Sequence, residues 1–156
     1  MKDETFMRQA IELARTGMTH GHGGPFGAVI VRENHVLGEG WNRVLIDHDP
    51  TAHAEIHAIR NACKSLGTHD LTGASIFTTG EPCPMCLGAI HWARIERIHF
   101  GFRIEEAARG GFDDLHFYQS FARPADHGLI PATPLLEKAS SALIDDYLQL
   151  AHRQAY

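Results

Sequence analysis

The stretch EPCPMC, residues 81–86, together with HAE at residues 53–55, decides how this sequence is organised. His53, Cys83 and Cys86 offer one imidazole and two thiolates, which are ligands that zinc prefers in proteins. Three protein ligands leave the fourth tetrahedral position open for water, and an open position is typical of a catalytic zinc ion. Glu55 follows His53 by two residues and is placed to move protons beside that position. We therefore predict a catalytic zinc centre.

Other interpretations of these residues are weaker. A Cys-x-x-Cys pair alone also fits a redox pair or half of a zinc ribbon. A thioredoxin-like redox pair is expected after a first strand, whereas this pair follows the third predicted strand. The chain has only three Cys, so a closed four-Cys zinc site is not available. His57 lies one turn after His53, but the order His-Glu-x-x-His of the zincins is absent, because Glu55 comes two residues after His53.

Composition narrows the class of protein. The chain has 156 residues, enough for one ordinary domain, and 44% of them are hydrophobic. No apolar run approaches the length of a membrane span, and no basic-then-apolar signal segment opens the chain, so we expect a cytoplasmic protein that does not enter a membrane. The formal net charge is −5, and basic residues do not cluster. A nucleic-acid partner is therefore disfavoured.

Hydrophobic periodicity and turn residues predict alternating helices and strands. A hairpin of two strands precedes the first zinc motif, and Asp49 or Thr51 is expected to cap the helix that carries His53. Strands joined through helices favour parallel pairing with right-handed crossovers, and ligands then bind at the carboxyl ends of the strands. The expected helices are 3–17, 52–65, 84–93, 105–109 and 140–152, and the expected strands are 26–32, 36–41, 75–79 and 97–101.

Both zinc-binding segments are predicted at helix N-termini. Pro84 suits the first position of its helix, because its ring fixes the backbone angle φ near the helical value. The positive end of the helix dipole and the free N–H groups there stabilise thiolates such as that of Cys83. Helix N-termini are therefore a favourable place for two cysteine ligands.

His-x-Glu followed by Pro-Cys-x-x-Cys is the signature of zinc nucleobase deaminases, and the sequence resembles the cytidine-deaminase-like superfamily. Within it, the sequence is most similar to the bacterial guanine deaminases of the small zinc-dependent type. Several matching stretches also occur in tRNA adenosine deaminases and plant guanosine deaminases. Phe112-Asp113-Asp114, Trp92 and the terminal Tyr156 favour guanine. The matching stretches are GPFGAVIV (24–31), Asn42, DPTAHAE (49–55), EPCPMCLGAI (81–90) and GFDD (111–114).

The resemblance implies a fold and an assembly. The fold is a three-layer α/β/α domain spanning residues 1–156, with a central five-stranded mixed sheet. Each subunit holds one zinc ion. The resemblance also implies a homodimer, in which the C-terminal segment of one subunit, about residues 135–156, closes the site of the other.

The resemblance further implies the hydrolytic deamination of guanine to xanthine and ammonia. A zinc-bound hydroxide attacks C2, and Glu55 is the proton shuttle. Asn42 and Asp114 approach the purine, with Asp113 as the competitor of Asp114 for that contact. Three aromatic residues complete the substrate-binding set: Phe26 and Trp92, which pack on the faces of the purine, and Tyr156 from the tail.

Two kinds of alternative remain. The first is a guanosine, cytosine or tRNA adenosine deaminase with the same zinc chemistry. A tRNA enzyme should have a basic groove and an open site, and the acidic balance of this chain together with the expected site-closing tail disfavours both. The second is a non-catalytic zinc-binding module that keeps the fold. Glu55 disfavours the module, because a structural zinc site has no use for that carboxylate.

Overall fold

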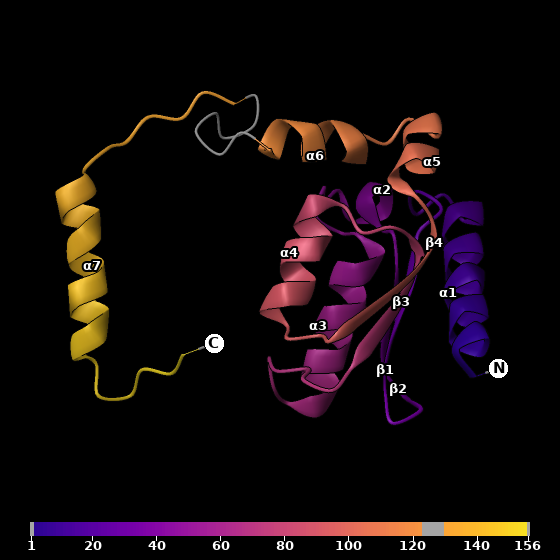
Figure 1. Cartoon of the computed structure of the whole chain (residues 1–156), viewed down its shortest axis with the longest axis horizontal. Helices are drawn as coiled ribbons and strands as arrows, with labels where there is room; N and C mark the ends of the chain where they lie inside the picture. Colours follow the sequence, from indigo (N-terminus) through magenta and orange to yellow (C-terminus); the bar gives the residue numbers. More distant parts are fainter. Residues whose placement is uncertain (1, 123–129, 156) are drawn as a thin grey trace. The chain divides into compact units, whose positions relative to one another are not determined.

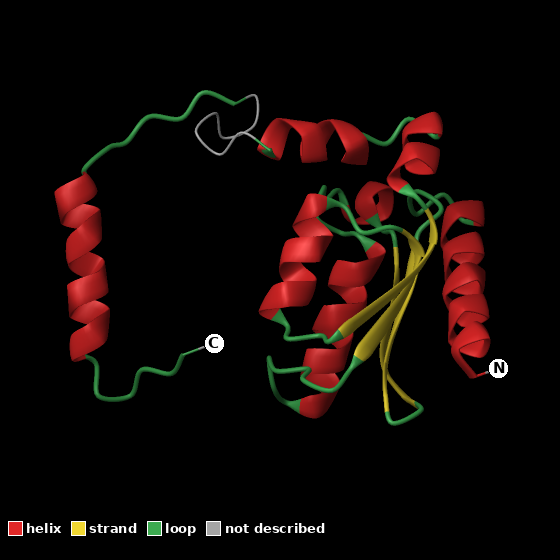
Figure 2. Ribbon diagram, in the orientation of Figure 1, coloured by secondary structure: helices red, strands yellow, loops and turns green. Residues whose placement is uncertain are grey.

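A helix-covered sheet forms the larger part of the chain. The computed structural model describes residues 2–122 and 130–155, and the chain divides into two compact units, Met1–Tyr118 and Gln119–Tyr156. In the first unit, helix α1 (Lys2–Thr19) lies on one face of the sheet. Helices α3 (Ala54–Leu66) and α4 (Pro84–Trp92) lie on the other (Figure 1). The predicted three-layer α/β/α architecture is confirmed (Figure 2).

Four strands form the sheet, in the order β2-β1-β3-β4. The strand β1 is antiparallel to both β2 and β3, whereas β3 and β4 are parallel. The strands β2, β3 and β4 therefore run in one direction, as expected for strands joined through helices. The predicted parallel pairing is wrong for β2 and β3, because β1 lies between them. The strands are β1 (Gly27–Arg32), β2 (His35–Trp41), β3 (Ser75–Gly80) and β4 (Arg97–Phe102).

The prediction of a five-stranded sheet is not met. Within residues 2–122 and 130–155 the sheet has four strands. After β4 the chain enters helix α5 (Ile104–Arg109) and then helix α6 (Asp114–Phe121). The α5 segment IEEAAR is rich in Glu and Ala, which favour helix over strand, so no fifth strand follows β4 directly.

Small residues bring α3 close to the sheet. A Cβ atom added at Gly38 would lie 2.4 Å from the carbonyl oxygen of Ala58, and one added at Gly40 would lie 2.3 Å from that of Ala54. Both glycines are on β2, so larger residues at either position would push the helix away. This close packing holds the N-terminus of α3 at the carboxyl end of β2, where the first zinc motif lies. The core between sheet and helices includes Ala28, Ile30, Ala54, Ala58, Ala62, Ile76 and Ile90.

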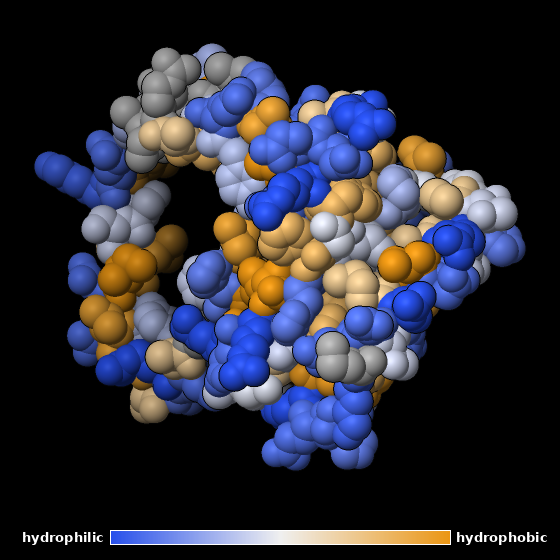
Figure 3. Space-filling view, turned by 45° about the vertical axis from the view of Figure 1, so that its right-hand side comes forward, coloured by the Kyte–Doolittle hydropathy of each residue, from blue (hydrophilic) through white to orange (hydrophobic). Residues whose placement is uncertain are grey.

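The second unit contains helix α7 (Glu137–Gln149), which begins and ends three residues earlier than predicted. None of its residues is buried, and one side of it is apolar. Hydrophobic side chains are visible on the surface of the chain in Figure 3. The large apolar residues of α7 are Leu143, Ile144, Tyr147 and Leu148, each at least 40% exposed. Among the described helices, none is both long and apolar enough to cross a membrane.

Candidate active site

The first zinc motif is held by a tight turn before α3. The Asp49 carboxylate accepts hydrogen bonds from the backbone N–H of Thr51, at 2.8 Å, and from its hydroxyl, at 2.7 Å. Neither residue caps α3 as predicted, because this turn uses both side chains. The N-cap is instead His53, in an extended backbone conformation and without a side-chain cap bond. Its imidazole is thereby left available for other contacts.

The second motif forms the start of α4. Cys83 is the N-cap, Pro84 takes the first helical position as predicted, and the Cys83 sulfur accepts a hydrogen bond from the backbone N–H of Cys86 at 3.5 Å. The helix α4 follows β3 directly, and α3 follows β2 after the short helix α2 (Val44–Asp47). Since β2 and β3 run in the same direction, their carboxyl ends meet at one edge of the sheet. That edge brings the two motifs together.

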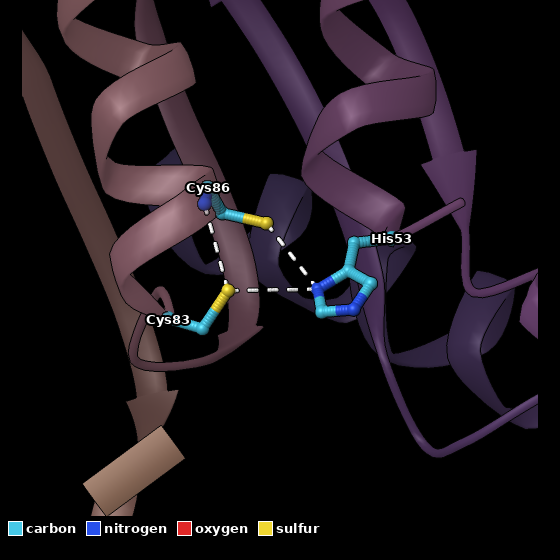
Figure 4. A group of neighbouring side chains, drawn as sticks. All are labelled: His53, Cys83 and Cys86. Carbon is cyan, nitrogen blue, oxygen red and sulfur yellow. Dashed lines mark hydrogen bonds between the residues drawn. The ribbon is translucent and has the colours of Figure 1, made fainter. Parts of the chain in front are cut away.

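Three side chains converge there from α3 and α4 (Figure 4). The Nδ1 atom of His53 lies 3.6 Å from the sulfur of Cys83 and 3.4 Å from that of Cys86. All three ligand atoms lie within 4.8 Å of one another. Tetrahedral zinc with bonds of about 2.0–2.3 Å separates its nitrogen and sulfur ligands by roughly 3.5 Å. The spacing and the donor set therefore fit one zinc ion with three protein ligands.

Electrostatics favour a thiolate in this cluster. A hydrogen bond from Cys86 lowers the pKa of Cys83 to about 4, and the His53 ring adds to the effect. The same bond and burial raise the pKa of Cys86. Burial lowers the pKa of His53, but its hydrogen bond to Cys83 and the charge of that sulfur outweigh burial, so the net shift is upward. The positive end of the α4 dipole also favours the anion.

Glu55 lies beside these ligands in the first turn of α3. It is only 4% exposed, and burial raises the pKa of its carboxyl group. One carboxylate oxygen, Oε1, accepts a hydrogen bond from Thr78 at 3.3 Å, and the other, Oε2, lies 3.4 Å from the Cys86 sulfur. A buried carboxyl group with a raised pKa next to a metal site is suited to proton transfer.

A cavity of about 400 Å³ opens next to the cluster. Its walls are mostly apolar, with a few polar groups that converge on the interior, as is usual for small-molecule sites. Phe26 and Phe112 meet edge to face in one wall, with ring centroids 4.8 Å apart. The residues that line it are Gly23, Gly24, Phe26, Asn42, Val44, Leu45, Pro50, His53, Glu55, Glu81, Cys83, Phe112 and Asp114.

Asn42 presents a hydrogen-bond donor to this cavity. Its Oδ1 atom accepts a hydrogen bond from the backbone N–H of Val44 at 3.1 Å, where the short helix α2 (Val44–Asp47) begins. The backbone donor fixes the orientation of the amide group, because the nitrogen could not accept that bond. Asn42 lines the cavity, and because Oδ1 is used by Val44, its amide nitrogen is the group that can donate to a ligand.

Asp114 presents an acceptor on another wall of the cavity. It is the first residue of α6 and is 9% exposed, whereas Asp113 is exposed and does not line the cavity. Burial raises the pKa of Asp114, and the negative Cys83 adds to the shift. Although the two aspartates are adjacent in the chain, the start of α6 buries one and leaves the other exposed. The cavity-lining carboxylate on α6 is that of Asp114.

One predicted substrate contact, Trp92, is not among the residues that line this cavity. Trp92 is the last residue of α4, about 13 Å along the helix axis from Cys83 at its start, and it is 63% exposed. It does not line the cavity of one chain because the length of α4 separates it from the metal ligands, and its contact with the substrate stays a prediction. Tyr156 lies outside the described residues.

The comparison with known families agrees with this geometry. The model of the cytidine and deoxycytidylate deaminase zinc-binding region matches residues 1–102, which include all three ligands. The chain belongs to this deaminase family. The matched residues include the three metal ligands, but they end before Phe112 and Asp114, which form other parts of the cavity wall.

Individual relatives of the family are similar over most of the chain. Guanine deaminase of Bacillus subtilis is 48% identical over 131 residues, covering 84% of each chain. A tRNA-specific adenosine deaminase of Haemophilus influenzae is 36% identical over 148 residues, covering 94% of this chain and 83% of the relative. The X-ray structure of the Bacillus subtilis guanine deaminase aligns with a TM-score of 0.92 at 42% identity, over 98% of both chains.

Sequence reasoning missed Thr78 and Tyr118 at this site, and it named Phe112 only as a feature that favours guanine, without a place in the cavity. Phe112 lines the cavity, Thr78 contacts Glu55, and Tyr118 donates a hydrogen bond to the backbone beside Cys83. Phe112 belongs to the stretch Phe112-Asp113-Asp114 that the sequence analysis singled out, so its position was a usable signal. In the sequence, Thr78 is an ordinary residue of a predicted strand, and no pattern relates it to Glu55.

Proposed function

We propose that this deaminase hydrolyses guanine to xanthine and ammonia. The observation that carries the proposal is the arrangement of Glu55. Its buried carboxylate lies between the ligands His53, Cys83 and Cys86 and a closely lined cavity. The similarity to a guanine deaminase at 48% identity supports guanine as the substrate. A non-catalytic zinc module would have no use for that carboxylate.

The chain's own residues divide the chemistry between them. When bound, zinc lowers the pKa of a coordinated water so that a nucleophile is available near neutral pH. As the water oxygen bonds to C2, Glu55 takes one proton of the water and delivers it to a ring nitrogen of guanine. Glu55 then takes the remaining hydroxyl proton and passes it to the amine at C2, so the C–N bond breaks, ammonia leaves and the oxygen stays as the new carbonyl of xanthine. One carboxylate is sufficient, because Glu55 receives each proton that it later gives. Such proton transfer contributes about a hundred- to ten-thousand-fold in rate.

The polar groups of the cavity match the edges of guanine. The amide nitrogen of Asn42 is a donor for O6 or a ring nitrogen, and the Asp114 carboxylate is an acceptor for N1–H and the amine. Adenine presents no N1–H group, so the same pair of contacts cannot form with it. Phe26 packs on a face of the base. A site with this arrangement rejects bases that leave its buried polar groups unpaired.

We propose a homodimer with exchanged C-terminal segments. The apolar side of α7 is exposed in the single chain, and an amphipathic helix is stable when it buries such a side. The segment 135–156 of one subunit is proposed to close the cavity of the other and to bring Tyr156 there. A second copy would also be needed to bring Trp92 to a substrate. Sedimentation of the purified protein tests this proposal, since a monomer at micromolar concentration would refute it.

We also propose that the enzyme works in the cytoplasm. Its zinc site requires two reduced thiols, and Cys63, Cys83 and Cys86 form no disulfide. Free cysteines are kept reduced in that compartment.

The activity is tested by ammonia release from the zinc-loaded protein. Guanine, guanosine, cytosine and adenine are offered separately, and a tRNA with adenosine in its anticodon loop is offered as a fifth substrate. We expect guanine to react fastest. The tRNA is included because of the adenosine deaminase relatives, although a net charge of −5 disfavours a polyanion. Faster turnover of any other substrate would replace guanine in the proposal.

A further inference from the structure

The buried hydroxyl group of Thr78 lies next to the candidate catalytic carboxylate. Thr78 is in β3, with no exposed surface. It pairs with Ala28 of β1 on one side and with Phe100 of β4 on the other, so its backbone is held from both sides. Alternate residues of a strand share a face, and Ile76 faces the core under α3. The hydroxyl therefore lies in an otherwise apolar layer, where it requires a hydrogen-bond partner.

That partner is the Oε1 atom of Glu55, 3.3 Å from the Thr78 hydroxyl. The other oxygen, Oε2, lies 3.4 Å from the Cys86 sulfur, which in turn lies 3.4 Å from Nδ1 of His53. One oxygen of the carboxylate thus faces the sheet and the other faces the zinc ligands. A cysteine that binds zinc as a thiolate has no proton to donate. Of the two side chains in contact with the Glu55 carboxylate, Thr78 and Cys86, only Thr78 then donates a hydrogen bond to it.

The hydroxyl has no role in filling space. Valine has nearly the shape of threonine and would occupy the same volume without a polar group in an apolar layer. The contact with Glu55 is therefore the physical reason for a hydroxyl at this position. A hydrogen bond from a rigid central strand is well suited to hold a side chain that must keep its orientation during reaction.

We propose that Thr78 is a positioning residue for proton transfer. Its hydroxyl holds Oε1 of Glu55 and leaves Oε2 to carry protons beside the zinc ligands. The inference rests on the proposed function, since it specifies which oxygen of Glu55 moves the proton. Oε1 keeps a free lone pair whether Glu55 is charged or protonated at Oε2, so the same hydrogen bond serves both halves of the cycle.

Two substitutions test the hydroxyl. In Thr78→Val we expect the kcat for guanine to fall about ten- to a hundredfold, the range for a hydrogen bond to a charged group. KM should change by less than about twofold, because the contact positions the carboxylate and does not bind the base. Thr78→Ser keeps the hydroxyl and should retain most of the wild-type kcat. Zinc content should equal that of the wild type in both.

A control separates positioning from packing. Ile76→Val alters the same face of β3, where Ile76 is fully buried. It should lower the melting temperature without changing kcat. If it lowers kcat as much as Thr78→Val does, the effect of the latter is general loosening of the strand, and the proposal is overturned.

A crystal structure of zinc-loaded Thr78→Val provides a readout that does not depend on activity. We expect the Glu55 carboxylate to leave its wild-type position, and to keep it in Thr78→Ser. An unmoved carboxylate or a wild-type kcat in Thr78→Val overturns the proposal. If the wild-type protein releases no ammonia from guanine, the proposed function fails, while the position of Glu55 in the two variant structures still decides the role of Thr78.

Discussion

The hydroxyl of Tyr118 donates a 2.6 Å hydrogen bond to the carbonyl oxygen of Pro82. Pro82 immediately precedes the zinc ligand Cys83, and Tyr118 lies one turn after Asp114 on α6. The bond therefore joins the helix that carries the cavity carboxylate to the loop that carries the metal ligand. Burial, followed by the charge of Cys83, raises the pKa of Tyr118 to about 12, so the hydroxyl keeps its proton and remains a donor at neutral pH.

Removing this hydroxyl should affect substrate binding more than chemistry. In Tyr118→Phe we expect the KM for guanine to rise several-fold, because the start of α6 and Asp114 lose their attachment to the metal loop. The free energy of unfolding should fall by about 1 kcal/mol, the typical contribution of one hydrogen bond. Steady-state kinetics and urea unfolding measure the two effects. An unchanged KM would show that Asp114 is placed without this bond.

Glu55 should be required for turnover but not for metal. Glu55→Gln keeps the size and the hydrogen-bond acceptor for Thr78 but cannot shuttle protons. We expect kcat to fall by about a hundred- to ten-thousand-fold, with one zinc ion per chain retained. Metal analysis alongside the ammonia assay separates the two properties. A variant with near-native kcat would refute the assignment of Glu55.

Cys83 should be required for zinc. Cys83→Ala leaves two of the three ligands, so we expect loss of stoichiometric zinc and, with it, of activity. Cys63→Ala is the matched control, since Cys63 is not in the cluster and its loss should leave the zinc content unchanged. Metal content is measured after dialysis against a weak chelator. Full zinc occupancy in Cys83→Ala would count against this ligand set.

The two neighbouring aspartates should differ in effect. Asp114→Asn replaces a charged acceptor in the cavity, and we expect kcat/KM for guanine to fall about ten- to a hundredfold. Asp113→Asn makes the same chemical change on an exposed residue and should stay within about twofold of the wild type. The pair is compared at saturating zinc. If Asp113→Asn has the larger effect, the placement of Asp114 against substrate is wrong.

The turn before His53 should make stability depend on pH. Hydrogen bonds from Thr51 lower the pKa of Asp49 below its usual 3.8 in the folded chain. A lowered carboxyl pKa stabilises the fold above the unfolded value and loses that contribution as pH falls through the folded value. Asp49→Ala should therefore melt below the wild type at pH 7, and the difference should shrink towards about pH 3. A constant difference in melting temperature across this pH range would show that the charge of Asp49 is not the source of the stabilisation.

The sequence by itself determined the metal centre and the class of fold. His53, Glu55, Cys83 and Cys86 lie in two short motifs with characteristic spacing, and the helices and strands around them follow hydrophobic periodicity over neighbouring residues. Motif spacing and hydrophobic periodicity both involve residues close together in the sequence, so both can be recognised before the fold is known. The common direction of β2, β3 and β4 was also predictable, because a helix between two strands brings the chain back to its starting edge.

Only the tertiary structure decided what depends on contacts between distant segments. It placed β1 between β2 and β3, brought Asp114 rather than Asp113 to the cavity, and left Trp92 at the far end of α4. It also paired Thr78 with Glu55, 23 positions apart in the chain. Strand order and side-chain packing are set by the burial of apolar surface over the whole domain. Residue propensities and motif spacing depend on residues close together in the sequence, so they do not specify these long-range contacts.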